Sequence, residues 1–516
     1  MRAASLLHSR LAAQILSAGP CNYMDNPTIT LGISPIDAAL QPPSPWSKQL
    51  LPWLVGVAFF MESLDTTIVN TAVPVIAHDM NVAPLSLKSV LASYTLSLAI
   101  FIPISGWMAD RFGTRRMFAS AIGLFTLASV LCGISSNMYM LIACRVLQGC
   151  GGAMMIPVGR LTLARAFDKS ELIRVLSFVT IPGWMGPILG PVAGAFIISH
   201  LPWGFIFLVN LPIGIAGLVL VHLYLPDYRE KTTKQIDITG FILLASGIAL
   251  LSYVLEIFGD INMNPSETMV LLAISLALIA GYGLHAARTA FPLLQLSLFR
   301  IPTFSVAVGG SFLIRLAVGG VPFLLPLLYQ VALGFTPIKS GLLILPQAIA
   351  GIIAKLIMPH ILHRIGYRSM LTTNTVILGS LLMLFATVGP GTPVWLIVLQ
   401  ASCYGACTSL QYTSMNTMIY EDIDENQKSS AGSLASMAQE LSISFGVAAA
   451  GFTTAFFMLD RFRPNPGDIM IAPCQRAFLI LGAFTILSTF IFRRLKSENG
   501  GVRHPKGLSL TDGAPA

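Results

Sequence analysis

Residues 106–116 read GWMADRFGTRR, and residues 359–368 read PHILHRIGYR. A shift of 253 positions superposes two arginines and a glycine of the two stretches: Arg111 on Arg364, Gly113 on Gly366 and Arg115 on Arg368. A proline and a histidine replace the first glycine and the aspartate, so the second stretch is a diverged copy of the first. The chain therefore contains an internal repeat.

The repeat lies in a very apolar chain. Of the 516 residues, 54% are hydrophobic and 10% are charged, against roughly 25% charged in soluble proteins, so a water-soluble globule is excluded. A membrane-spanning helix needs about 20 mainly apolar residues. Fourteen windows meet this requirement: 51–72, 88–109, 117–136, 138–162, 175–199, 203–225, 238–258, 268–287, 303–329, 338–360, 369–388, 393–418, 431–457 and 475–492.

Each copy of the repeat follows the second window of a block of six. We therefore predict an all-α polytopic membrane protein with two parallel six-helix repeats, at 50–225 and 301–495. Residues 226–300 contain an inserted helix pair, and an even number of inserted helices keeps both repeats in the same orientation. Residues 1–49 are expected to form a disordered cytoplasmic extension and residues 496–516 a disordered tail.

Basic residues in short loops predict the orientation. One set of alternate connections holds seventeen Lys and Arg residues, and the other set holds five. The richer set should face the cytoplasm, which places both termini on the cytoplasmic side of the membrane. The net charge of +8 is scattered in short clusters between apolar windows, which is not the contiguous patch that nucleic-acid binding requires.

Four motifs resemble a known family. They are LDTTIVNTAVPVIA at 64–77, the stretch at 106–116, RVLQGCGGAMMIP at 145–157 and GPILGPVAGA at 186–195. Together they resemble the major facilitator superfamily, in its fourteen-helix drug:proton antiporter branch of the EmrB/QacA type. SMNT at 414–417 and FLLPLLYQ at 323–330 are similar to the MdtD-like members. The resemblance implies the major facilitator fold and export by alternating access.

Glu62 and Asp65 are acids in the middle of the first window, three residues apart and so on one helical face. A charge there is costly, with insertion scales giving about +2.5 to +3.5 kcal/mol. Such an acid carries a proton, faces a water-filled cavity or pairs with a cation. We favour a proton carrier over a static ion pair, and among the cations inside the windows the resemblance implies Arg145 as the partner.

Other polar residues inside the windows are candidates for the substrate cavity: Arg315, Glu440, Gln148 and Lys355. The 253-residue offset places Arg315 opposite Glu62 in the second repeat. Lys355 lies close to the expected end of its window, so snorkelling of its side chain to the interface is the favoured interpretation.

The loop motif at 106–116 and the helix motif at 186–195 each have a functional and a structural interpretation. The resemblance implies a cytoplasmic gate at Gly106, Asp110, Arg111, Gly113, Arg115 and Arg116. The arginines alone could simply set topology, and the glycines would allow close helix approach and a tight turn. The resemblance also implies a seal against proton leak at Gly186, Pro187, Gly190, Pro191 and Gly194, although small residues also suit ordinary tight packing.

The sequence thus predicts a proton-coupled antiporter that exports apolar or cationic drug-like compounds. The alternative within transport is a dedicated exporter of one metabolite, siderophore or lipid-like molecule. An intramembrane enzyme would need a cluster such as HExxH, which is absent from the sequence. No metal or cofactor is expected besides the coupling proton. The expected partners are a small-molecule substrate and membrane lipid, the chain is expected to be a monomer, and a periplasmic adaptor is left open.

Overall fold

A computed structural model describes residues 45–495, apart from 231–234, 258–263, 425–426 and 459–465. The expectations for residues 1–44 and 496–516 lie outside the described residues. The elements of regular secondary structure in the described part are all helices, and no strand occurs in it. All described residues belong to one unit, Ser44–Ala516.

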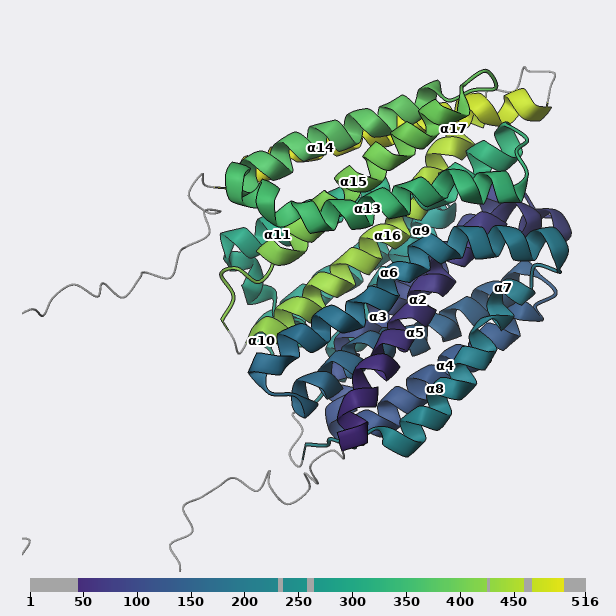
Figure 1. Cartoon of the computed structure of the whole chain (residues 1–516). Coiled ribbons are helices and arrows are strands. Elements are labelled where there is room, and N and C mark those ends of the chain that lie inside the picture. The colour runs from purple at the N-terminus through teal and green to yellow at the C-terminus, as the bar shows by residue number, and fades with distance from the viewer. Residues whose placement is uncertain (1–44, 231–234, 258–263, 425–426, 459–465, 496–516) are drawn as a thin grey trace, which may run out of the picture. The chain divides into compact units, whose positions relative to one another are not determined.

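The first block of helices corresponds to the first predicted repeat (Figure 1). Its short elements are η2 (Pro84–Leu87) and α7 (Phe205–Leu208). Its long helices are α2 (Pro45–Asp79), α3 (Lys88–Phe112), α4 (Thr114–Gly133), α5 (Met138–Ala166), α6 (Lys169–His200) and α8 (Asn210–Tyr224). The inserted pair follows as α9 (Ile238–Ile257) and α10 (Pro265–Arg288), and ends in η3 (Leu296–Arg300).

The last block begins with a segment that changes its helical form twice. It consists of α11 (Pro302–Val318), α12 (Val321–Pro326) and the π-helical η4 (Leu327–Ala332). The remaining elements are α13 (Pro337–Ile365), α14 (Tyr367–Leu384), η5 (Phe385–Thr387), α15 (Val394–Met418), α16 (Lys428–Met458) and α17 (Pro466–Phe492).

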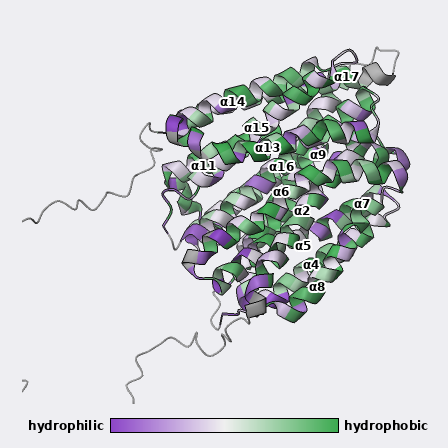
Figure 2. Ribbon diagram, in the orientation of Figure 1, coloured by the Kyte–Doolittle hydropathy of each residue, from purple (hydrophilic) through white to green (hydrophobic). Residues whose placement is uncertain are grey.

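Thirteen helical segments of the described chain are long and apolar enough to cross a membrane. Hydrophobic residues follow the helix bodies, whereas hydrophilic ones gather at helix ends and loops (Figure 2). The remaining predicted window, 393–418, is also helical. It corresponds to α15, which has 25 residues. It is not among the thirteen segments, and residues such as Thr408, Ser409 and Asn416 on this helix line a cavity. The predicted polytopic all-α fold is confirmed.

The internal repeat extends to the backbone of one turn. Gly113 separates α3 from α4 with φ +94°, and Gly366 separates α13 from α14 with φ +76°. The two turns lie at the offset of 253 residues found in the sequence. Positive φ is readily adopted only by glycine, which explains why this residue persists in a copy that has otherwise diverged.

Helices α2 and α6 pack closely because α6 presents glycines to α2. A Cβ atom on Gly186 would lie 2.6 Å from the carbonyl carbon of Ser63, and one on Gly194 would lie 2.7 Å from the carbonyl oxygen of Ile68. Such distances allow no side chain, so the two backbones touch. Figure 1 shows the two helices side by side.

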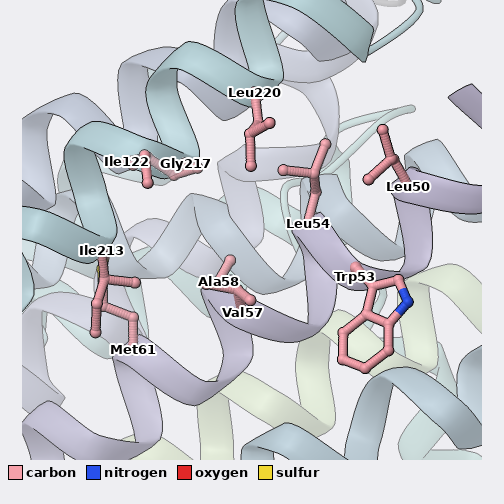
Figure 3. Close-up of a pocket in the computed structure, with 11 residues that line it drawn as sticks. Leu50, Trp53, Leu54, Val57, Ala58, Met61, Ile122, Ile213, Gly217 and Leu220 are labelled. Carbon is pink, nitrogen blue, oxygen red and sulfur yellow. The ribbon is translucent and has the colours of Figure 1, made fainter.

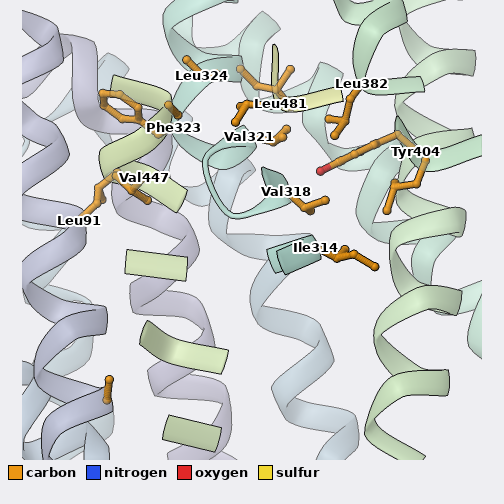
Figure 4. Close-up of a cluster of buried hydrophobic side chains, with 14 of the residues drawn as sticks. Leu91, Ile314, Val318, Val321, Phe323, Leu324, Leu382, Tyr404, Val447 and Leu481 are labelled. Atoms are coloured by element: carbon orange, nitrogen blue, oxygen red, sulfur yellow. The ribbon is translucent and has the colours of Figure 1, made fainter. Parts of the chain in front are cut away.

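The two blocks contact each other near the end of α2 at Asp79, called here the Asp79 end. Gln330 Nε2 of η4 donates to Thr71 O of α2 at 2.9 Å, and Ser444 Oγ of α16 donates to Ala92 O of α3 at 3.1 Å. A buried cluster with members from both blocks adds apolar contacts, including Leu91 and Val447 (Figure 4). The opposite end, where α3 turns into α4, is called the Asp110 end.

Candidate functional site

Asp65 lies at the centre of a buried cluster in the first block. Its Oδ2 accepts a hydrogen bond of 2.5 Å from Arg145 Nη1 of α5. Its Oδ1 accepts from Gln148 Nε2 at 2.7 Å and from Asn210 Nδ2 at 2.9 Å. Both carboxylate oxygens are therefore satisfied, as a buried charge requires. The structure brings together the acid and the cation that the sequence paired.

A second layer of contacts holds this cluster in place. Ser129 Oγ of α4 accepts from Asn210 at 2.9 Å and donates to the carbonyl oxygen of Phe207 at 2.9 Å. The Arg145 guanidinium lies 4.2 Å from the centroid of the buried Tyr94 ring. Ser129 and Asn210 were not found from the sequence, because uncharged polar residues inside apolar windows are common and give little signal.

Glu62 has different surroundings from Asp65, although it lies on the same helix. Its side chain is half-buried, and its buried Oε2 atom has no hydrogen-bond partner. The charges that act on it are Glu440 of α16, which repels it, Arg160 of α5, which attracts it, and Asp65, which repels it. Glu62 thus faces an acid of the other block and can exchange a proton without breaking a hydrogen bond at Oε2.

Arg160 is a residue that the sequence reasoning missed. It follows Arg145 by fifteen residues on α5, close to four helical turns, so both side chains lie on one face. A second arginine at this spacing inside one apolar window was the signal that could have found it. Its guanidinium lies 5.2 Å from the centroid of the Phe59 ring.

A cavity of ≈ 410 Å³ lies between the two blocks. Helices α2, α6, α11, α12, α13 and α15 provide its walls. Polar lining residues include Thr67, Asn70, Thr71, Gln347, Thr408, Ser409, Thr413 and Asn416. This volume is within the range of about 300–1,000 Å³ that is typical of small-molecule sites.

Arg315 and Lys355 both line this cavity. The Arg315 guanidinium lies 3.8 Å from the centroid of the Tyr412 ring, and Lys355 Nζ lies 4.3 Å from that of Trp184. Snorkelling of Lys355 stays a prediction, and in the structure its Nζ lies over the Trp184 ring of α6.

Three other predictions, one for a pairing and two for cavity positions, differ from the structure. No ion pair joins Arg315 to Glu62 among the described residues, and Arg315 interacts instead with Ser311, whose Oγ accepts from Nε at 3.1 Å. Gln148 belongs to the Asp65 cluster and is not part of the cavity lining. Glu440 is also outside the lining, but it acts electrostatically on Arg315.

The α6 motif contributes to the cavity and to helix packing. Pro187 and Pro191 line the cavity. Thr67 Oγ1 donates to the carbonyl oxygen of Gly186 at 3.1 Å, and a Cβ on Gly190 would lie 2.1 Å from that same Oγ1. The motif therefore packs α6, which is one wall of the cavity, against α2, which carries both acids.

At the Asp110 end, Asp110 pairs with a residue outside its own motif. Arg165 Nη2 of α5 donates to Asp110 Oδ1 at 2.7 Å and to Glu230 Oε1 at 3.0 Å. The backbone N–H of Glu230 also donates to Asp110 O at 3.2 Å. In the sequence, Arg165 contributes to the predicted orientation alone, and Glu230 carries no signal of a role at this end.

The glycines and arginines of this motif play unequal structural roles. A Cβ on Gly113 would lie 2.3 Å from Asp227 Oδ1, and Asp227 Oδ1 also accepts from the Arg115 backbone N–H at 3.1 Å. The Arg115 guanidinium donates to His222 O, and the side chains of Arg111 and Arg116 are exposed. The close helix approach expected at Gly106 is wrong, since a Cβ there would meet no heavy atom within 4 Å.

A second cavity, of ≈ 320 Å³, lies within the first block and differs in chemistry. Its lining comes from α2, α4 and α8 and is apolar, with the Trp53 indole nitrogen as the one side-chain heteroatom besides the Met61 sulfur (Figure 3). It contains none of the charged residues described above. The cavity between the blocks is therefore the better candidate for a site with charged groups.

Comparisons with known proteins match this architecture. The family model of the Major Facilitator Superfamily matches residues 55–447 and 309–507. A protein of Serratia proteamaculans (strain 568) is 41% identical over 405 residues, which is 78% of this chain and 85% of the relative. One of Escherichia coli O9:H4 (strain HS) is 37% identical over 446 residues, 86% of this chain and 94% of the relative. Both are named "multidrug resistance protein MdtD".

Solved structures share the fold at low sequence identity. A D-xylose–proton symporter matches with a TM-score of 0.62 and 14% identity, over 88% of this chain and 99% of that one. The inward open xylose transporter XylE from E. coli matches with a TM-score of 0.58 and 14% identity, over 86% and 95% of the two chains. The chain belongs to the Major Facilitator Superfamily and is an integral membrane transporter similar to the MdtD proteins, not an enzyme.

Proposed function

We propose that this protein is a secondary antiporter that exports apolar drug-like compounds in exchange for protons. The observation that carries the proposal is the pair of acids on α2: Asp65 is fixed by Arg145, Gln148 and Asn210, whereas Glu62 Oε2 is buried without a partner. An ionisable residue at such a depth is a functional candidate by default. The names of the MdtD relatives support drug-like substrates.

The two acids have different roles in this proposal. Glu62 binds and releases the coupling proton, because neither step breaks a hydrogen bond at Oε2. Asp65 binds Arg145 and so packs α2 against α5. Because Glu62 lies on the same helix, its protonation state is coupled to this packing. Protonation of Glu62 removes its repulsion with Glu440 and so favours approach of the two blocks.

The mechanism is alternating access. Contacts between the blocks at the Asp79 end, such as Gln330 with Thr71, support a state closed at that end. We place the Asp110 end in the cytoplasm of a bacterial inner membrane, together with both termini, because the basic loops lie there. Asp110, Arg165 and Glu230, which are joined by ion pairs, are the gate residues that we propose at that end.

The energetics permit coupled export without ATP. One charge that crosses 100 mV releases about 2.3 kcal/mol, which sustains a gradient of roughly fifty-fold. Cationic compounds are not expected as substrates, because the cavity lining contains Arg315 and Lys355 and no Asp or Glu among the described residues. A dedicated exporter of one metabolite would use the same coupling, as would a pump with a periplasmic adaptor.

Transport in inverted membrane vesicles tests the proposal. A panel of apolar compounds is offered with and without a proton gradient, and accumulation is measured for the wild type and for Glu62→Gln. Several compounds should accumulate only with the gradient and only in the wild type. Accumulation without a gradient, or unchanged accumulation by Glu62→Gln, would contradict the proposal. Accumulation of a single compound would favour the dedicated exporter.

A further inference from the structure

The cavity between the blocks carries an unbalanced positive charge. Its lining includes Arg315 and Lys355, whereas no Asp or Glu occurs among the lining residues of the described chain. Both cations are removed from bulk water inside a membrane protein, where an unpaired charge is costly. A site of this composition is completed by a negative charge from outside the protein.

The contacts of the two cations position them without neutralising them. Arg315 lies over Tyr412 and Lys355 over Trp184, at 3.8 and 4.3 Å from the ring centroids. An aromatic face attracts a cation through its quadrupole but carries no net charge. Each cation is therefore held against a ring that is also able to contact an apolar ligand.

Nearby acids do not remove the imbalance. Glu440 attracts Arg315 electrostatically, but no ion pair within 4.0 Å joins the two in the described structure. Glu440 also repels Glu62 of the first block, because the two side chains carry like charges. Lys355 forms no ion pair with an acidic side chain among the described residues.

The rest of the lining suits an apolar body. Leu325, Ile344 and Ile352 contribute aliphatic surface, and Asn70 and Asn416 contribute amide groups. Asn416 Oδ1 already accepts from Gln439 Nε2 at 2.9 Å, so its amide N–H groups remain as donors. Donors and cations together match an acceptor-rich group such as a carboxylate.

We propose that the cavity binds small organic anions, with a carboxylate attracted by Arg315 and Lys355 and an apolar or aromatic body against Trp184 and Tyr412. This deepens the proposed export function and rests on it for its physiological meaning. The recognition itself is a property of the cavity and requires no proton gradient.

The test uses two probes of nearly equal shape and opposite charge, 2-naphthoate and 2-naphthylmethylammonium. Their binding to the purified full-length protein in uncharged detergent is measured by calorimetry. Naphthoate should bind more tightly than the ammonium. Lys355→Gln and Arg315→Gln should each weaken naphthoate binding by about tenfold or more, because each removes a charge-assisted contact.

Three further variants make the result specific. Lys339→Gln is the matched control, because Lys339 lies on the same helix over Phe335, at 3.6 Å from the ring centroid, but outside the cavity. It should bind naphthoate as the wild type does. Lys355→Arg should retain binding, since it keeps the charge. Glu440→Gln should tighten binding, since it removes the negative charge that acts on Arg315.

Tighter binding of the ammonium probe, or unchanged naphthoate binding in both Lys355→Gln and Arg315→Gln, would overturn the inference. Phosphatidylglycerol is added in a separate arm. If it competes with naphthoate in the wild type but not in Lys355→Gln, the site takes a lipid headgroup and the inference of a soluble carboxylate is wrong. Proton-coupled export of a neutral compound together with absent naphthoate binding would overturn this inference and leave the proposed function intact.

Discussion

Asp65 on α2 and Arg145 on α5 form an ion pair of 2.5 Å, and their side chains are 0% and 1% exposed. Removal of one partner from a buried pair leaves the other charge uncompensated, at a cost of about 3–5 kcal/mol. Asp65→Asn should therefore lower the melting temperature of the purified protein clearly, and Asp65→Asn/Arg145→Gln should recover part of the loss.

Glu62→Gln is the control for this comparison, because Glu62 is less buried and its Oε2 makes no hydrogen bond. It should melt close to the wild type. If Asp65→Asn also melts like the wild type, the pair does not hold α2 against α5 in the way described.

The contact between Gly190 and Thr67 predicts a specific rescue. A Cβ on Gly190 would lie 2.1 Å from Thr67 Oγ1 and 3.1 Å from the backbone Ile68 N, whereas a Cβ on Gly186 would lie 2.7 Å from the backbone Leu64 N. Both Gly190→Ala and Gly186→Ala should destabilise the fold by about 1–3 kcal/mol through overpacking. Thr67→Ala should relieve part of the first substitution, because Thr67 Oγ1 is removed while Thr67 Cβ at 2.8 Å remains, and none of the second, as thermal unfolding of the two double variants would reveal. Equal behaviour of both would speak against the close approach.

The pair of Asp110 and Arg165 should matter for turnover more than for stability. The side chains are 29% and 22% exposed, and pairs of this kind contribute about 0.2–1 kcal/mol. Asp110→Asn should thus change the free energy of unfolding by no more than about 1 kcal/mol. It should export more slowly in vesicles, because a gate contact is lost. Arg111→Ala, with an exposed side chain, should leave the rate unchanged. An Asp110→Asn rate equal to that of the wild type would remove the gate role.

Asp237 ties the inserted helix pair together in a pH-dependent way. Burial raises the pKa of Asp237, but hydrogen bonds from the Gly240 N–H, His285 and the Leu293 N–H outweigh it, so the net pKa is lowered from 3.8. A lowered pKa stabilises the folded state above the ordinary pKa, and this contribution is lost as the pH falls through the lowered value.

Asp237→Asn should therefore melt below the wild type at neutral pH, and the gap should close below about pH 4. The melting temperatures of both proteins across this range provide the measurement. Asp168→Asn is the matched control, since Asp168 precedes α6 without a side-chain cap hydrogen bond. A gap for Asp237→Asn that stays constant at all pH values would show that the charge of Asp237 is not what stabilises the pair.

The sequence was sufficient for the fold and for one buried pair, for physical reasons. Window length and apolarity decide what can span a bilayer, and a charge inside such a window needs a partner. The family resemblance then favoured Arg145 over the other cations inside the windows. The turn at Gly113 and Gly366 was predictable because the positive φ restricts the residue type.

Other features depend on helix ends and rotations that periodicity does not fix. Lys355 lies close to the end of its predicted window, and spacing alone could not show that its Nζ lies over the Trp184 ring of α6. Asn210 and Arg165 contact the acids of other helices, so their partners follow from packing and not from spacing. Gly106 belongs to a motif yet makes no close contact in this state.

Proton release on substrate binding tests the central claim most directly. The compound of the panel that is exported most strongly is added to purified protein in weakly buffered detergent, and a pH indicator reports released protons. The wild type should release protons when the compound binds, whereas Glu62→Gln should bind the compound and release none. Proton release by Glu62→Gln equal to that of the wild type would contradict the assignment of Glu62 as the proton-carrying acid.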